Sequence, residues 1–313
     1  MRGLELAAQY FKEYGRALIE TEFAPYADRI AAGLVGQGSE RYGFDDAVSR
    51  DHDYCAGFCL WISSEDDALF GFALEKAYRR LASEFSGVST REKERGGSSR
   101  YGVITFDAFF EPLVGPRYAA LTPEDYLYTP SHYLADASNG AVFYDRGGTF
   151  TRIYESIRDG MPEDVRLKKL AAALAGMAQS GQYNYARTLS HGEQGAAVLA
   201  LDEFVRCAAA AIFLLNRRHA PYYKWLLRAL ADLQVLGHLA PSLEYLLTGD
   251  NDDTGRLVKA EILEDICAAV VGILREQGLS EAHSDFLEDH AQHVMRHIVS
   301  PAIRNLHLME GAL

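Results

Sequence analysis

The hydrophobic pattern changes near Arg158, and this change is the feature that most limits the fold. Before it, short apolar runs alternate with helical stretches and with turns rich in glycine and proline, whereas the pattern from Pro162 onward is helical. We therefore expect an α+β chain with two domains. Residues 1–158 would form a mixed sheet flanked by helices, and residues 159–313 an all-helical domain that makes the other wall of a cleft. With 313 residues, of which 48% are hydrophobic, the chain is long enough to bury two cores.

The first half contains four β-prone runs. The apolar run 30–35 is typical of a buried strand, and it ends in a glycine-rich turn at residues 36–39. The other predicted strands are residues 51–62, 101–107 and 141–144. Helices are predicted at residues 3–19, 66–85, 196–216, 241–247, 254–276 and 280–307.

The charge and the apolar content limit the location and the partners. A formal charge of −13 opposes attraction to a phosphate backbone, so a nucleic-acid partner is disfavoured. No apolar run reaches the roughly 20 residues that span a bilayer, and the N-terminus lacks a secretory pattern. We therefore expect a cytoplasmic protein without a membrane segment.

The residue types that often bind metals give weaker signals elsewhere. The four cysteines are too few and too scattered for a disulfide framework, and Cys55 and Cys59 have no second cysteine pair that would favour zinc. His290, His293 and His297 share one helical face at a spacing compatible with metal ligation, but a hydrated or interfacial face is the favoured interpretation.

The chemistry-bearing pattern follows the glycine turn. Gly38 and Ser39 are followed, after eleven residues, by Asp51 and Asp53 at the head of a predicted strand. Residues i and i+2 of a strand face the same side, so the two carboxylates would converge on hard cations, which prefer oxygen ligands. A third carboxylate, Asp107, is predicted on a neighbouring strand.

This arrangement resembles the signature of the polymerase-β-like nucleotidyltransferase superfamily: a Gly-Ser turn after a strand, an Asp-x-Asp pair about ten residues later, and a third acid on a later strand. The string 38–53 also looks like that of a functionally uncharacterised bacterial family placed in this superfamily. The similarity continues into residues 216–225, so it covers most of the chain.

The resemblance implies a nucleotidyltransferase-type sheet domain with a two-metal site. Asp51, Asp53 and Asp107 would hold two Mg²⁺ ions, with Mn²⁺ as another option, and Asp107 would help to deprotonate the acceptor. Gly38 would let backbone N–H groups approach a phosphate, and Ser39 would donate its hydroxyl to the same oxygens.

Three cations are candidate phosphate ligands. Arg41 and Arg50 lie between the Gly-Ser and Asp-x-Asp parts of the signature, although the motif does not fix their roles. Lys224 follows Pro221 at a predicted helix start, where exposed N–H groups favour an anion. The aromatic residues beside Lys224 serve packing or base stacking, and the sequence leaves both open.

We therefore expect a metal-dependent nucleotidyltransferase. It would move a nucleoside monophosphate from a nucleoside triphosphate to a hydroxyl of a small molecule or protein, with release of pyrophosphate. Two alternatives stay open: a non-catalytic nucleotide-binding or regulatory module of antitoxin type, and a phosphohydrolase that uses the same cleft. The sequence fixes neither the base nor the acceptor, and an apolar C-terminal helix face leaves a homodimer open.

Overall fold

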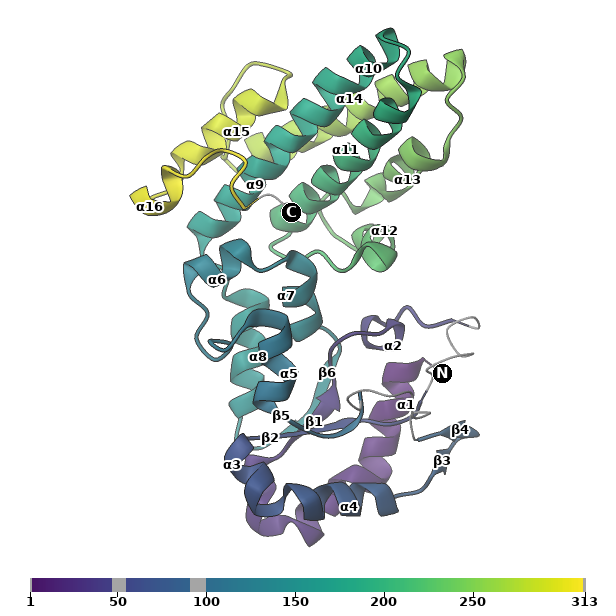
Figure 1. Cartoon of the computed structure of the whole chain (residues 1–313), viewed down its shortest axis with the longest axis vertical. Coiled ribbons are helices and arrows are strands. Elements are labelled where there is room, and N and C mark those ends of the chain that lie inside the picture. Colours follow the sequence, from purple (N-terminus) through teal and green to yellow (C-terminus); the bar gives the residue numbers. More distant parts are fainter. Residues whose placement is uncertain (1, 47–54, 91–99, 312–313) are drawn as a thin grey trace. The chain divides into compact units, whose positions relative to one another are not determined.

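The computed structural model describes residues 2–46, 55–90 and 100–311 (Figure 1). The chain is α+β, as expected, and it divides into two compact units. The first unit comprises Met1–Thr122 and Tyr133–Gly160, and the second comprises Pro123–His132 and Met161–Leu313. Within the described residues, no helix is both long and apolar enough to cross a lipid bilayer.

The first unit contains short helices and two sheets. Its helical elements are α1 (Gly3–Tyr10), η1 (Phe11–Gly15), η2 (Leu18–Glu22), η3 (Ala24–Arg29), α2 (Ser39–Tyr42), α3 (Ser64–Asp66), η5 (Asp67–Gly71), α4 (Phe72–Arg80), α5 (Phe106–Val114), most of α7 (Ser131–Ala137) and α8 (Thr149–Asp159). The strands are β1 (Ala31–Leu34), β2 (Cys59–Ile62), β3 (Glu84–Phe85), β4 (Val88–Ser89), β5 (Gly102–Thr105) and β6 (Ala141–Asp145).

The main sheet is mixed, with strand order β5-β2-β1-β6. β1 is antiparallel to both β2 and β6, whereas β2 is parallel to β5. The register therefore brings the end of β1 and the starts of β2, β5 and β6 to the same end of the sheet. We call it the turn end, and it carries Leu34, Cys59, Gly102 and Ala141. The opposite end of the sheet, which we call the far end, carries Ala31, Ile62, Thr105 and Asp145.

Both faces of the sheet are covered, which explains why β1 and β2 are continuous apolar runs. Leu60 shares one cluster with Phe11 of η1. Trp61 points to the other face, where its ring stacks on Phe150 of α8 at 4.1 Å. Gly33 is required in β1 because a Cβ would collide with the carbonyl oxygen of Ala141.

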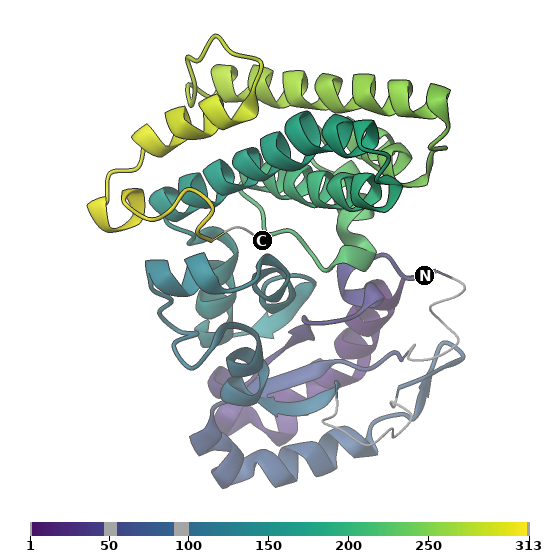
Figure 2. The same cartoon turned by 45° about the horizontal axis from the view of Figure 1, so that its top comes forward.

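The second unit is helical throughout its described residues. Its elements are α6 (Pro123–Tyr128), the first residues of α7, α9 (Glu163–Met177), η6 (Ala178–Tyr185), α10 (Ala186–Ser190), α11 (Gln194–Leu215), α12 (Tyr223–Ala231), η7 (Gly237–Leu239), α13 (Ala240–Thr248), α14 (Asp253–Glu276), α15 (Leu287–Arg296) and α16 (Pro301–Arg304). The helices α9 and α11 lie side by side in both views (Figure 2) and share one apolar core. The single helix predicted for residues 280–307 is wrong, because α15 ends at Arg296 and Pro301 begins a separate short helix.

Two buried lysines of α9 hold segments that are distant in sequence. Lys168 donates to the carbonyl oxygens of Leu308 and Glu310 at 2.8 and 2.6 Å. Lys169 donates to those of Tyr126 and Leu127 at 3.2 and 2.8 Å. The second contact ties α6 to the helical unit, although α6 lies within the range 1–158 that the sequence assigns to the first domain.

Candidate functional site

The glycine turn, residues 36–39, connects β1 to α2 at the turn end of the sheet. Gly36 and Gly38 have φ angles of 117° and 139°, in the region that favours glycine. A Cβ on Gly38 would collide with the carboxylate of Glu40 and the guanidinium of Arg100. The turn therefore requires glycine both for its backbone and for the close approach of these side chains.

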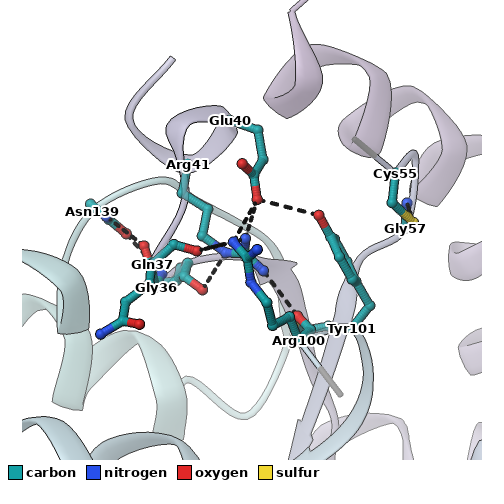
Figure 3. A network of polar contacts seen from close by, with 11 residues as sticks. Gly36, Gln37, Glu40, Arg41, Cys55, Gly57, Arg100, Tyr101 and Asn139 are labelled. Carbon is teal, nitrogen blue, oxygen red and sulfur yellow. Dashed lines mark hydrogen bonds and ion pairs between the residues drawn. The ribbon is translucent and has the colours of Figure 1, made fainter. Parts of the chain in front are cut away.

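Arg41 lies beneath this turn and is only 3% exposed. Its Nε donates to the carbonyl oxygen of Val35 at 3.0 Å, and its Nη1 donates to that of Gln37 at 2.9 Å. Nη2 donates to the carbonyl oxygen of Arg100, also at 2.9 Å (Figure 3). One guanidinium thus joins the residue before the turn and a residue within it to Arg100, which precedes β5.

Glu40 gathers the charged groups of this network. Its carboxylate pairs with Arg41, and it accepts from Arg100 Nη2 at 3.2 Å and from the Tyr101 hydroxyl at 3.3 Å (Figure 3). Burial acts to lower the pKa of Arg41, but Tyr101 and Glu40 hold the net pKa above its ordinary value. Burial also raises the pKa of Cys59 to about 11, so this thiol stays protonated at neutral pH.

The connection between α7 and β6 holds the turn from the other side. The Asn139 side chain accepts from the backbone N–H of Gly36 and donates to its carbonyl oxygen, both at 2.8 Å. The Tyr42 hydroxyl donates to Asp136 at 2.6 Å. Because backbone and side-chain groups are paired on two sides, the shape of the glycine turn is fixed by its surroundings.

Ser39 begins α2 directly after the turn and is partly exposed. Within the part of the chain that the structure describes, its hydroxyl makes no hydrogen bond. Gly38 and Ser39 therefore present a small, polar and accessible backbone segment beside the buried network.

Three of the predicted site residues, Asp51, Asp53 and Arg50, lie outside the described residues. In the described part of the strand predicted at residues 51–62, residues 55–58 are not in a strand and β2 begins at Cys59. Cys59 pairs with Gly33, so the chain enters β2 at the turn end of the sheet, beside the glycine turn.

The prediction that Asp107 lies on a strand is wrong. β5 ends at Thr105, whose hydroxyl accepts from the N–H of Ala108 and caps α5, so Asp107 lies in the first turn of a helix. Thr105 pairs with Ile62 at the far end of the sheet. Since a strand rises about 3.3 Å per residue, Thr105 is about 10 Å along the sheet from Gly102 at the turn end.

At the far end, Asp107 belongs to a separate polar group. It accepts from the Ser64 hydroxyl and the Tyr118 hydroxyl, each at 2.5 Å. These hydrogen bonds hold the pKa of Asp107 below its ordinary value. Asp107 therefore cannot share a cation with a ligand at the glycine turn, because Mg²⁺ binds its oxygen ligands at about 2.1 Å.

The remaining candidates lie in the second unit. Lys224 is exposed in the first turn of α12. His290 is fully buried, where its ring nitrogens contact Ser280 Oγ and the Ser284 carbonyl oxygen at 2.8 Å each. His297, by contrast, is exposed, so the histidine face does not gather into one site.

A known family overlaps this region of the sequence. Residues 126–226 match a family described as a domain of unknown function, DUF4037. Its model covers about a third of the chain, including Asp136, Asn139 and the string 216–225, and it stops short of the Gly38–Ser39 pair. A search of curated proteins found no match.

The DUF4037 match and the geometry draw attention to residues that sequence patterns missed. Asn139 has the appearance of an ordinary Asn-Gly turn residue, yet it holds Gly36, which is 103 positions away. Glu40, Arg100 and Tyr101 carry no motif of their own. A pairing over such sequence distances becomes visible only once the strand register is known.

Proposed function

We propose that this protein is a metal-dependent nucleotidyltransferase that moves a nucleoside monophosphate from a nucleoside triphosphate to a hydroxyl of a small molecule or protein. The observation that supports this most is the location of the glycine turn. The turn lies at the end of the sheet where β2 begins. The first residue of β2, Cys59, is six positions after Asp53 in the sequence. The Gly-Ser part of the signature thus lies at the end of the sheet where β2 begins, and the Asp-x-Asp part precedes β2 in the sequence.

The glycine turn suits the triphosphate. Gly36 and Gly38 both have positive φ angles, and a glycine turn of this kind lets backbone N–H groups approach phosphate oxygens closely. Ser39 offers an accessible hydroxyl to the same oxygens. The buried ion pair of Arg41 and Glu40 keeps this surface in one shape before a ligand arrives.

The Asp-x-Asp pair suits the metal. Asp51 and Asp53 would hold Mg²⁺ or Mn²⁺ through carboxylate oxygens, the ligands that these cations prefer. When bound, the cations supply positive charge that offsets the charge of the transferring phosphoryl group. Asp107 takes no part in this proposal, and Arg50 and Lys224 remain proposed phosphate ligands.

The test is a thermal-shift screen of the four common nucleoside triphosphates with and without Mg²⁺. A ligand at 100 times its dissociation constant stabilises the native state by about 2.7 kcal/mol, which raises the melting temperature by several degrees. We expect this shift for at least one triphosphate and only with the divalent cation. Asp51→Asn should remove the shift without lowering the melting temperature of the unliganded protein.

Product analysis separates the competing activities. Incubation with the stabilising triphosphate, labelled in its α-phosphate, should give pyrophosphate and a labelled acceptor from a cell extract. Free labelled monophosphate alone would identify a phosphohydrolase. Binding without turnover would identify a regulatory module, and the absence of any Mg²⁺-dependent shift would refute the proposal.

A further inference from the structure

We propose that Arg41 is a positioning residue of this nucleotidyltransferase: it holds the glycine turn in the shape that receives the triphosphate and does not contact the phosphates itself. This inference rests on the proposed function. It replaces the simplest interpretation of a cation two positions after a Gly-Ser pair, which is a direct phosphate ligand.

The hydrogen bonds of Arg41 point inward. Each of its three guanidinium nitrogens donates to a carbonyl oxygen, from Val35, Gln37 and Arg100, and Nη1 also pairs with Glu40. The side chain is 2% exposed. To bind a phosphate, the guanidinium would have to leave several charge-assisted hydrogen bonds in a buried site, where unpaired polar groups are costly.

The acceptors of Arg41 define its role. Val35 precedes the glycine turn, Gln37 lies within it, and Arg100 precedes β5. A planar fork of donors can hold three such carbonyl groups in one geometry, whereas a lysine ammonium offers a compact point charge on a flexible stem. Arg41 therefore fixes the turn against the edge of the sheet.

Asn139 holds the same turn from the opposite side. Its amide pairs with both backbone groups of Gly36, as a neighbouring strand would. Asn139 carries no charge, so any effect of its substitution on triphosphate binding must act through the turn. It thereby provides a second, independent means of loosening the same segment.

The experiment compares Arg41→Lys, Arg41→Met and Asn139→Leu with the wild type, using the triphosphate that the thermal-shift screen selects. Positioning predicts that Arg41→Lys loses as much as Arg41→Met, roughly 10- to 100-fold in kcat/KM, since misplacement by about 1 Å has effects of this size. Asn139→Leu should lose activity in the same way, because its uncharged side chain can neither accept from the Gly36 N–H nor donate to the Gly36 carbonyl oxygen. Arg16→Lys, on an exposed ion pair with Glu20, is the matched control and should be unchanged.

A second readout needs no activity. Amide hydrogen exchange of a peptide covering residues 36–42 should accelerate in Arg41→Lys and in Asn139→Leu, while peptides from α8 keep the wild-type rate. The variant that combines Arg41→Lys with the Asn139 substitution should lose less kcat/KM than the product of the two single fold-losses, because both substitutions loosen the same turn.

The outcomes separate this inference from the proposed function. If Arg41→Lys keeps most of the wild-type kcat/KM while Arg41→Met loses it, the charge matters, Arg41 is a direct ligand, and the inference is overturned. Unchanged exchange of residues 36–42 in both variants overturns it as well. If the wild type itself binds no triphosphate with Mg²⁺, the proposed function fails first, and this inference fails with it.

Discussion

The two ends of one sheet differ in how their polar groups are held. At the turn end, the buried Arg41 donates to three carbonyl oxygens and pairs with the buried carboxylate of Glu40. At the far end, Asp107 is only partly buried, and its carboxylate meets two neutral hydroxyl groups. The first arrangement fixes a backbone segment, whereas the second fixes the start of one helix.

This difference favours the turn end as the ligand site of our proposal. The buried network holds the Gly-Ser segment in one backbone conformation, and the segment itself stays accessible to a ligand. The hydroxyl groups around Asp107 already occupy both oxygens of that carboxylate. We therefore propose the turn end, and not the far end, as the place where the triphosphate binds.

The largest expected effect separates the acids that precede β2 from the acid at the far end. Asp51→Asn or Asp53→Asn should lower nucleotidyl transfer by about 1000-fold or more, since each removes a ligand charge from the metals that stabilise the transition state. Asp107→Asn should stay within about threefold of the wild type, because surface substitutions outside the site have small effects. Initial rates with labelled triphosphate measure all three variants, and an inactive Asp107→Asn with a native melting curve would reverse the comparison.

A second effect tests how tightly the turn end is packed. Gly140→Ala places a Cβ against the carbonyl oxygen of Leu34 and imposes a φ of 64° on alanine, so it should lower the free energy of unfolding by about 3 kcal/mol. Gly115→Ala, after α5, has a φ of 84° but nothing within 4 Å, and strain alone should cost about 1–2 kcal/mol. Urea denaturation followed by circular dichroism gives both values. Equal losses would mean that the turn end yields as easily as an open loop.

The sequence predicts one end of the sheet better than the other. The apolar run before Gly36 predicts β1 and the turn after it, and the helical pattern of the second half predicts the helices of the second unit. Both predictions rest on local signals, namely apolar runs and periodicity. The strand prediction for residues 101–107 fails at its end. The polar–apolar alternation of β5 continues past Thr105, although Thr105 caps a helix that includes Asp107. The pairing of Asn139 with Gly36 carries no local signal at all.

The smallest expected effect concerns acid stability at the far end. The pKa of Asp107 is lowered in the folded state by the Ser64 and Tyr118 hydroxyl groups, so its contribution is present above the unfolded pKa and is lost as the pH falls through the folded one. Solvent screening keeps the contribution below about 1 kcal/mol. The difference in unfolding free energy between the wild type and Asp107→Asn should shrink from neutral pH to a pH of about 3. A difference that grows on acidification would contradict the hydrogen bonds described here.

The central claim is that the triphosphate binds at the turn end of the sheet. Hydrogen exchange with and without a Mg²⁺–triphosphate complex tests it most directly. We predict slower exchange in residues 36–42 and 55–58, and unchanged exchange in residues 62–66 and 105–110 at the far end. Protection that is confined to the far end, or absent from residues 36–42 while the ligand is bound, would contradict the account.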